Sequence, residues 1–184
     1  MKQASPPTIN DVADRAGVST ATVSRFLNAP QKVSVQAAEK IEAAVLELGY
    51  TPNYGARVLA SKRTNTVGAI IPTMDNAIFA RGLQALQEAL AKQGRVLLVA
   101  SSNYDAAQEL EQIKALVNQG VECLVLIGTQ RSQAAYDYLT KRSIPLIIAW
   151  AYEPNFDYPC VGFDNKAAAM ALTQEVLSKG HRDI

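Results

Sequence analysis

Arg25 is the residue with the most specific chemistry in this sequence. It lies in a predicted helix at Thr20–Asn28, on the face opposite an apolar stripe, and Thr20 and Ala21 share that face. An arginine guanidinium can bond the O6 and N7 atoms of guanine bidentately, and threonine or alanine methyl groups can contact thymine. This face is therefore a candidate for reading base-pair edges in DNA.

Three short helices are predicted in the first fifty residues. Thr8, Ser19 and Ser34 each precede a stretch in which apolar residues recur at helical spacing, and all three are good N-cap residues. Gly17 and Gly49 are expected to end the first and third helices. A helix, a short turn and a second helix form the helix-turn-helix geometry, whose second helix enters the major groove. On spacing alone, three helices packed only for stability, with the arginine merely solvated, are the alternative.

Composition and charge narrow the class of protein. The 184 residues are 48% hydrophobic and 19% charged, which is typical of a globular chain. No apolar run reaches the roughly 18–20 residues of a membrane span, and residues 1–7 do not form a secretory signal, so no membrane partner is expected. Residues 1–63 carry eight Lys and Arg against five Asp and Glu, whereas the rest carry ten against twelve. An excess of basic residues in this N-terminal part of the chain, residues 1–63, whose helical region we call the head, favours contact with nucleic acid.

Metal, disulfide and enzyme chemistry find little support in the residue types. Cys123, Cys160 and His181 are too few for a disulfide framework or a metal site, and a reducing, cytoplasmic compartment fits best. Cys123 lies in an apolar run and is read as a core residue, and Cys160 has no nearby histidine base. There is no phosphate-binding glycine motif. We expect no cofactor, no metal and no enzymatic activity.

From Thr66 onward, short β-type runs alternate with helical stretches. Four runs start 29, 27 and 23 residues apart, as in successive βαβ units of a parallel sheet. The predicted fold class is therefore α/β, with a small all-α head followed by a Rossmann-like sheet. The predicted strands are 67–71, 96–100, 123–127, 146–149 and 159–163, and the predicted helices are 77–93, 105–118, 132–142 and 164–179.

Parallel α/β sheets bind ligands at the carboxyl ends of their strands. Asp75, Phe79, Trp150, Tyr152 and Asp164 follow predicted strands and combine aromatic faces with carboxylates. Such a set suits a polyhydroxylated ligand, because aromatic rings stack on apolar sugar faces while carboxylates bond hydroxyl groups. The alternative for each residue is packing at a strand end, and Asp164 could simply cap the helix that follows.

A second signal comes from the order of residues in the head. The residues that carry it are Asp11-Val12-Ala13, Ala16-Gly17-Val18-Ser19-Thr20-Ala21-Thr22-Val23-Ser24-Arg25 and Gly49-Tyr50-Thr51-Pro52-Asn53. This pattern resembles the lactose/galactose repressor family of bacterial transcription regulators, and a looser likeness extends to residues 180–182. The resemblance implies a helix-turn-helix domain at 1–52, a hinge helix and linker at 53–65, and the N-terminal part of a periplasmic-binding-protein-like effector domain at 66–184, incomplete at its C-terminus.

The resemblance also implies how such a protein contacts DNA. Thr20, Ala21 and Arg25 match the base-reading positions, and Leu59, in the hinge helix, matches a wedge that enters the central step of the minor groove. The other implied DNA contacts are Thr8, Ser19, Thr22, Asn28, Lys32, Ser34, Asn53 and Arg57. The implied partners are a palindromic operator, a second copy of the chain, and an effector that is a sugar, a sugar acid or a nucleobase.

The sequence therefore leaves two function classes to be compared. The first is a repressor whose operator affinity is controlled by a small effector, with activation at some promoters and either direction of the effector's action left open. The second is a solute-binding protein with an incidental helical head, which the groove-facing Arg25 and the lack of a signal sequence oppose.

Overall fold

The computed structural model describes residues 6–52, 55, 58, 61 and 63–183. The chain divides into two compact units, Met1–Arg63 and Thr64–Ile184, and each is described by itself. Asn53, Arg57 and Leu59, three of the predicted DNA contacts, lie outside the described residues. None of the described helices combines the length and apolar character that a membrane span requires.

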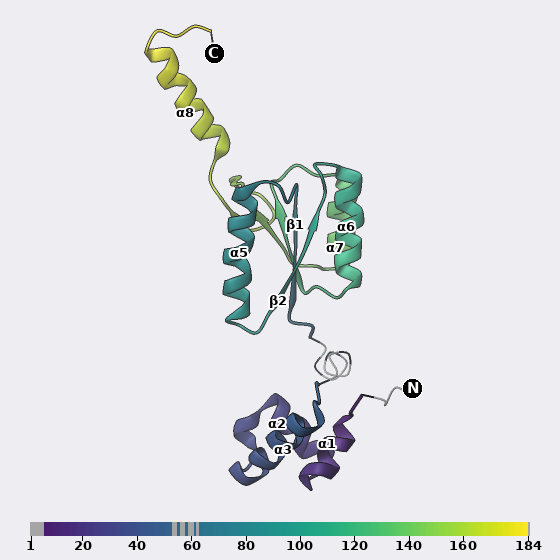
Figure 1. Ribbon diagram of the computed structural model, residues 1–184. Coiled ribbons are helices and arrows are strands. Elements are labelled where there is room, and N and C mark those ends of the chain that lie inside the picture. The colour runs from purple at the N-terminus through teal and green to yellow at the C-terminus, as the bar shows by residue number, and fades with distance from the viewer. Residues whose placement is uncertain (1–5, 53–54, 56–57, 59–60, 62, 184) are drawn as a thin grey trace. The chain divides into compact units, whose positions relative to one another are not determined.

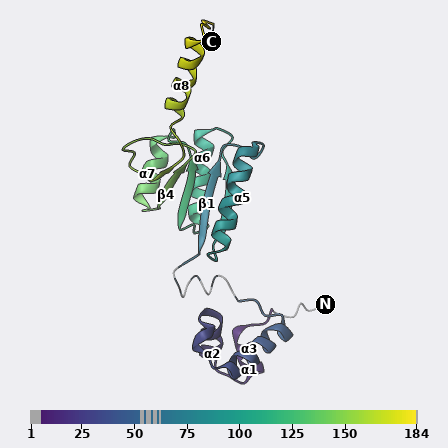
Figure 2. The same ribbon diagram turned by 90° about the vertical axis from the view of Figure 1, so that its left-hand side faces the viewer.

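The first unit is a bundle of helices whose ends are set by short polar caps (Figures 1 and 2). Thr8, Ser19 and Ser34 accept a backbone N–H bond at the starts of three α-helices, as the sequence predicts. Gly17 and Gly49 end two of these helices with left-handed φ angles of 66° and 61°, which glycine adopts without a Cβ penalty. The elements are α1 (Ile9–Ala16), α2 (Thr20–Asn28), the 3-10 turn η1 (Pro30–Lys32) and α3 (Val35–Leu48).

Each helix of the head contributes a side chain that is completely buried. Val12 of α1, Val23 of α2 and Ile41 of α3 have no exposed surface, and Phe26 and Leu27 pack partly buried around them. Burying an aliphatic side chain of this size stabilises the fold by about 1.5–3 kcal/mol. The inward face of α2 is therefore fixed by the core, and the residues on its opposite side face solvent.

The second unit is a parallel sheet with helices on both faces (Figures 1 and 2). The strand order is β2-β1-β3-β4-β5, with α5 on one face and α6 and α7 on the other. The predicted α/β fold class with a helical head is confirmed. The elements are β1 (Thr66–Ile71), α5 (Ala77–Ala91), β2 (Val96–Ser101), α6 (Ala106–Asn118), β3 (Cys123–Ile127), α7 (Gln133–Lys141), β4 (Leu146–Ala149), β5 (Cys160–Val161) and α8 (Asn165–Ser178).

The two faces of the sheet are covered to different extents. Between the sheet and the α6–α7 layer lies a dense core that includes the fully buried Ile113, Leu124, Leu126 and Ile148. On the α5 face a smaller cluster forms around Ala69. The strand β1 is buried along its whole length, as expected of an apolar run in the middle of a parallel sheet.

The last predicted strand is shorter than the sequence indicates. The sequence predicts a strand at 159–163, but β5 comprises only Cys160 and Val161. Its neighbour β4 ends at Ala149, and Trp150 then adopts a φ of +58°, which breaks the extended geometry of the ladder. Phe163, just beyond β5, is 61% exposed, and α8 contains no buried residue.

Candidate nucleic-acid interface and ligand site

The predicted base-reading residues lie together on the outer face of α2. Thr20, Ala21, Arg25 and Asn28 are all exposed, while Val23 on the opposite side is fully buried. Within the described part of the chain, no ion pair joins Arg25 to a carboxylate. Its guanidinium therefore keeps its five N–H donors for a partner outside the molecule.

Hydroxyl groups mark the amino-terminal end of α2. The Ser19 Oγ accepts the Thr22 N–H at 3.2 Å and lies 2.9 Å from the Thr22 Oγ1. One of the two hydroxyl protons is used between them, which leaves the other to donate outward. Together with the unpaired N–H groups of a helix start, this arrangement suits a phosphate oxygen. The exposed Lys32, on η1, adds a positive charge to the same unit.

The start of α1 is a less favourable phosphate contact than its sequence suggests. Thr8 and Asp11 form a capping box in which the Thr8 hydroxyl and N–H both donate to the Asp11 Oδ2 at 2.7 Å. These hydrogen bonds, that from the hydroxyl above all, lower the pKa of the Asp11 carboxyl. The hydroxyl proton of Thr8 is thus committed to a carboxylate, and its predicted DNA contact stays a prediction.

Asn28 and Ser34 also use polar groups within the head. The Asn28 Nδ2 donates to the Ser24 carbonyl oxygen at 2.8 Å, so only the amide oxygen and one N–H are left for DNA. The Ser34 Oγ accepts the Ala37 N–H at 3.4 Å as the N-cap of α3, and its proton is left to donate. Both side chains lie at helix ends on the surface of the unit, where a backbone phosphate can approach.

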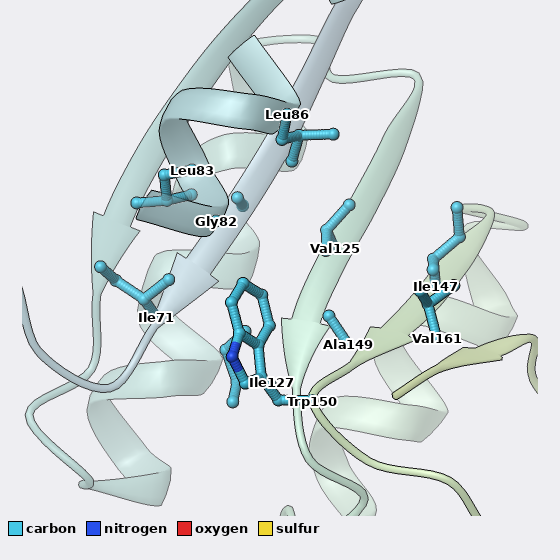
Figure 3. Close-up of a pocket in the computed structure, with 11 residues that line it drawn as sticks. Ile71, Gly82, Leu83, Leu86, Val125, Ile127, Ile147, Ala149, Trp150 and Val161 are labelled. Atoms are coloured by element: carbon cyan, nitrogen blue, oxygen red, sulfur yellow. The ribbon is translucent and has the colours of Figure 1, made fainter. Parts of the chain in front are cut away.

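In the second unit, two of the predicted ligand residues meet at the carboxyl end of the sheet. Phe79 of α5 and Trp150 after β4 pack edge to face, with ring centroids 5.7 Å apart and an interplanar angle of 74°. Figure 3 shows the indole beneath Gly82. A Cβ added at Gly82 would lie 2.2 Å from the Trp150 ring, so this glycine is what allows the indole to approach α5.

A cavity of about 260 Å³ lies beside Trp150, between α5 and the face of the sheet (Figure 3). Of the five predicted ligand residues only Trp150 lines it, and the remaining lining residues are apolar. They are Ala69, Ile71, Gly82, Leu83, Leu86, Val125, Ile127, Ile147, Ala149 and Val161. This cavity therefore offers an apolar wall rather than the hydroxyl-bonding groups that a polyhydroxylated ligand requires.

The three other predicted ligand residues lie at loop and helix starts. Asp75 is exposed immediately before α5, and Tyr152 is 52% exposed. Asp164 is the N-cap of α8, where its Oδ1 accepts the Ala167 N–H at 2.8 Å, so the capping alternative describes its present contact. The Asn165 Nδ2 donates to the Trp150 carbonyl oxygen at 3.2 Å and links the start of α8 to the aromatic pair.

A buried ion pair supports the loop between β3 and α7, and it was not predicted from the sequence. The side chain of Arg131 has no exposed surface, and its Nε lies 3.5 Å from the Glu109 Oε2, an ionic contact without hydrogen-bond geometry. Its Nη2 donates to the carbonyl oxygens of Ile127 at 3.3 Å and Gly128 at 2.8 Å. The guanidinium also lies 5.2 Å from the centroid of the Tyr136 ring.

Burial changes the titration of this cluster. Desolvation raises the pKa of the Glu109 carboxyl, and the nearby Arg131 charge opposes that rise without cancelling it. Burial likewise raises the pKa of Tyr136, whose hydroxyl donates to the Thr129 carbonyl oxygen at 2.8 Å. The sequence did hold a signal: Glu109, Ile113 and Leu116 share one helical stripe, so the carboxylate lies on the buried face of α6.

The cysteine assignments can be compared with the structure directly. Cys123 is half-buried within β3 as a free thiol, and burial raises the pKa of that thiol. A raised thiol pKa reduces the thiolate fraction, which opposes a nucleophilic role. Cys160 is also a free thiol. Among the described residues, no cluster of three or more His, Cys, Asp or Glu side chains could hold a metal ion.

Comparisons with known proteins agree with this architecture. Residues 8–53 match the model of bacterial regulatory proteins of the lacI family, and residues 64–184 match that of periplasmic binding proteins and the sugar binding domain of the LacI family. The HTH-type transcriptional regulator GntR of Escherichia coli (strain K12) is 32% identical over 97% of this chain and 54% of that protein. The chain thus spans about half the length of the curated relatives it matches.

Solved structures show the same fold. A LacI-family transcriptional regulator from Silicibacter pomeroyi superposes with a TM-score of 0.82 at 30% identity, over 96% of this chain and 53% of that one. The lac repressor dimer bound to operator and the anti-inducer ONPF superposes with a TM-score of 0.81 at 24% identity, over 96% and 54% of the two chains. The head and sheet define a class of regulator with a periplasmic-binding-like domain. The chain belongs to the LacI family of bacterial regulatory proteins.

The contact between Gly82 and Trp150 leads to a first prediction. An alanine normally stabilises a helix interior by about 1 kcal/mol relative to glycine. In Gly82→Ala the new methyl overlaps the indole, so we expect the free energy of unfolding to fall by about 1–3 kcal/mol and the tryptophan emission to shift to longer wavelength. Trp150 is the single tryptophan of the chain, so denaturant unfolding followed by its fluorescence reports the site directly.

Ala89→Gly on the exposed side of α5 is the matched control. This variant should lower the free energy of unfolding by about 1 kcal/mol through helix propensity alone and leave the tryptophan emission unchanged. If Gly82→Ala were instead more stable than the wild type, with the same emission, the packing of the indole against α5 would be disproved.

The buried ion pair leads to a pH-dependent prediction. Because the folded-state pKa of Glu109 is raised, its carboxyl destabilises the fold as pH rises through that pKa, and Arg131 limits this loss. Arg131→Met leaves the carboxylate unpaired and should cost about 3 kcal/mol near pH 7, but much less at about pH 4, where Glu109 is protonated. Urea unfolding of variant and wild type at both pH values measures the difference.

Glu109→Gln combined with Arg131→Met is the control, since no carboxylate is then left to ionise. The double variant should be more stable than Arg131→Met near neutral pH, and the difference between the two variants should largely disappear at about pH 4, where the Glu109 carboxyl of the single variant is protonated. A cost of Arg131→Met that is equal at both pH values would contradict the assigned electrostatics.

Proposed function

We propose that the chain is part of a sequence-specific DNA-binding transcriptional regulator, a repressor whose operator affinity is controlled by a small effector. The observation that carries this proposal is the outer face of α2, where Arg25, Thr20 and Ala21 lie exposed in a unit that matches the lacI-family model. An arginine at this position can form the bidentate guanine contact that dominates direct readout in the major groove. The proposed site of action is the cytoplasm, where the operator lies.

Affinity and symmetry support a dimer on a palindrome as the acting form. One head can contact only one half-site, and two-fold dimers double the contact area by reading inverted repeats. The excess of Lys and Arg over Asp and Glu in residues 1–63 favours phosphate contacts. Binding should therefore weaken steeply as salt is added, because each neutralised phosphate releases counterions.

We further propose that residues 53–65 act as a hinge and linker between a head at 1–52 and an effector unit at 66–184. This assignment rests on the likeness of the sequence to the family. The hinge helices of two subunits would enter the minor groove, where Leu59 would unstack the central base step and Asn53 and Arg57 would contact the backbone. The unstacking costs a few kcal/mol, which a bent operator offsets by contacting more protein surface.

The effector site is proposed at the carboxyl end of the sheet. The supporting observation is the Phe79–Trp150 pair at this end of the sheet. Asp75, Tyr152 and Asp164 follow strands that end at the same edge, and they are proposed as its polar or mixed partners. The family model that matches this unit is described as a sugar binding domain, which favours a sugar or sugar acid. Because ligands change the occupancy of two conformations, an effector controls DNA affinity only through different affinities for the two states.

Arg25 provides the direct test of DNA recognition. Duplexes that the wild-type chain prefers are selected from a random pool, and fluorescence anisotropy then compares the best duplex with a scrambled one. Arg25→Ala should reduce the discrimination between them by about 1–3 kcal/mol, since the bidentate base contact is lost. An unchanged ratio would remove the basis of the proposed function.

Lys32→Ala is the matched control for charge. A lysine that contacts only phosphate should weaken binding to the preferred and the scrambled duplex alike, and should reduce the salt slope by about one. Arg25 and Lys32 are both exposed cations of the same unit, so their different effects separate base reading from general electrostatics.

Leu59 tests the hinge proposal in the same assay. Leu59→Ala should weaken binding to the preferred duplex several-fold by removing the apolar wedge. Circular dichroism checks that the head keeps its helices in this variant. An affinity for the preferred duplex equal to that of the wild type would rule out the wedge.

A further inference from the structure

Three segments meet at the amino-terminal edge of the sheet, which is opposite to the proposed effector site. Thr64 and Asn65 lead into β1, Arg95 leads into β2, and Glu122 leads into β3. The parallel register of β1 with both neighbouring strands brings these starts to one edge (Figure 1). Thr64 is also the first residue of the second unit, so the chain enters the sheet at this point.

One carboxylate holds the backbone at this entry point. The Glu122 Oε1 accepts the N–H of Thr64 at 2.9 Å and the N–H of Asn65 at 3.0 Å. Its Oε2 lies 3.3 Å from the Arg95 Nη1, which places a positive charge on the other side of the carboxylate. Hydrogen bonds to an ionised acceptor are about twice as strong as neutral ones. The Glu122 side chain is only 24% exposed, so solvent weakens these bonds little.

Other bonds complete the attachment. The Thr64 Oγ1 donates to the Gly120 carbonyl oxygen at 2.6 Å, and the Val96 N–H donates to the Asn65 carbonyl oxygen at 2.9 Å. Asn65 has a φ of +52°, so the chain turns sharply at the residue before β1. Asparagine adopts the left-handed region more readily than most residues, and here the Glu122 carboxylate also bonds the backbone on the amino-terminal side of the turn.

We propose that Glu122 is a positioning residue that anchors the end of the linker to the sheet and so sets the direction in which the linker leaves it. The proposal rests on the proposed function, since the direction of the linker matters only if the linker carries a DNA-binding head. With the anchor in place, Thr64 and Asn65 move with β1 as part of the sheet. Without the anchor, Thr64 and Asn65 can move relative to β1, and a movement of the sheet is transmitted to the linker less completely.

The simpler role for Glu122 is to neutralise Arg95. The two roles predict different consequences for Arg95→Met. If Glu122 is the anchor, its bonds to the two amides survive the loss of Arg95, because Oε1 and Oε2 serve different partners. If it serves only the arginine, Arg95→Met releases the carboxylate and the two amides together.

Amide hydrogen exchange of the 184-residue chain tests the anchor. In the wild type the Thr64 and Asn65 amides should exchange slowly, and in Glu122→Ala they should exchange about tenfold faster or more, since two charge-assisted bonds are lost. Glu122→Gln keeps an acceptor oxygen and should fall in between, while Arg95→Met should stay close to the wild type. Glu111→Ala, which removes an exposed carboxylate paired with Lys114 on α6, is the control and should change neither amide.

Trp150 emission separates a local effect from unfolding, because the indole lies at the other end of the sheet and should not change in any of these variants. Equal exchange rates at Thr64 and Asn65 in Glu122→Ala and wild type, with the emission unchanged, would overturn the anchor. A loss of protection in Arg95→Met as large as in Glu122→Ala would also overturn it.

DNA binding then tests the consequence for the linker. Glu122→Ala should lower the ratio of affinities for a selected palindrome and for its isolated half-site several-fold, and leave half-site affinity unchanged, since the head is untouched. An equal loss on both duplexes, or no change in the ratio, would overturn the positioning role. If the wild-type chain prefers no duplex, the proposed function fails, and hydrogen exchange alone decides whether Glu122 anchors the linker.

Discussion

The rotational setting of α2 is the constraint on which the account of DNA recognition depends. A helix presents a chosen face to DNA only if its opposite face is held, and here Val23 is fully buried against Val12 and Ile41. Turning α2 by one residue, about 100°, would bring Val23 to solvent and lose about 1.5–3 kcal/mol of burial. The Ser19 cap fixes where the helix begins, so both its rotation and its register are determined. The outward direction of Arg25 is therefore a consequence of the apolar core.

The parallel sheet of the second unit has two edges with different features, one where the strands end and one where they begin. At the carboxyl edge, the positive φ of Trp150 and the missing side chain of Gly82 allow an aromatic pair to form next to an apolar cavity. The buried Arg131 supports the loop after β3 at the same edge. At the amino edge, Glu122 holds the residues that lead into β1. The buried strand β1 runs from one edge to the other, and packed cores move in discrete steps rather than deforming continuously. Under the proposed function, an effector at the carboxyl edge would act on the linker at the amino edge through this core.

The sequence predicted the elements well because their signals are local. Caps at Thr8, Ser19 and Ser34 and apolar periodicity place the helices to within a residue or two, and the spacing of apolar runs gives the parallel sheet. The predicted length of β5 was wrong. It depends on where the neighbouring strand β4 ends, and the backbone of Trp150 leaves the extended conformation just after that end. The pairing of Arg131 with Glu109 and the bonds of Glu122 to Thr64 and Asn65 were missed because the partners lie 22, 58 and 57 residues apart in the sequence. The helical stripe shows that Glu109 is buried, but it does not show which residue pairs with it. The predicted ligand residues follow the carboxyl ends of strands, as the topology indicates, and among them Phe79 and Trp150 are joined by a contact; their role in binding an effector stays a prediction.

Nuclear magnetic resonance of the isotope-labelled chain, titrated with its preferred duplex and with a scrambled one, tests the central claim most directly. If the outer face of α2 reads bases, the largest shifts on the preferred duplex should fall on the amides of Thr20 and Ala21 and on the Nε of Arg25. On the scrambled duplex the Arg25 Nε should shift little, because phosphate contacts alone remain. Shifts concentrated on α3, or an Arg25 response that is the same with both duplexes, would contradict this account.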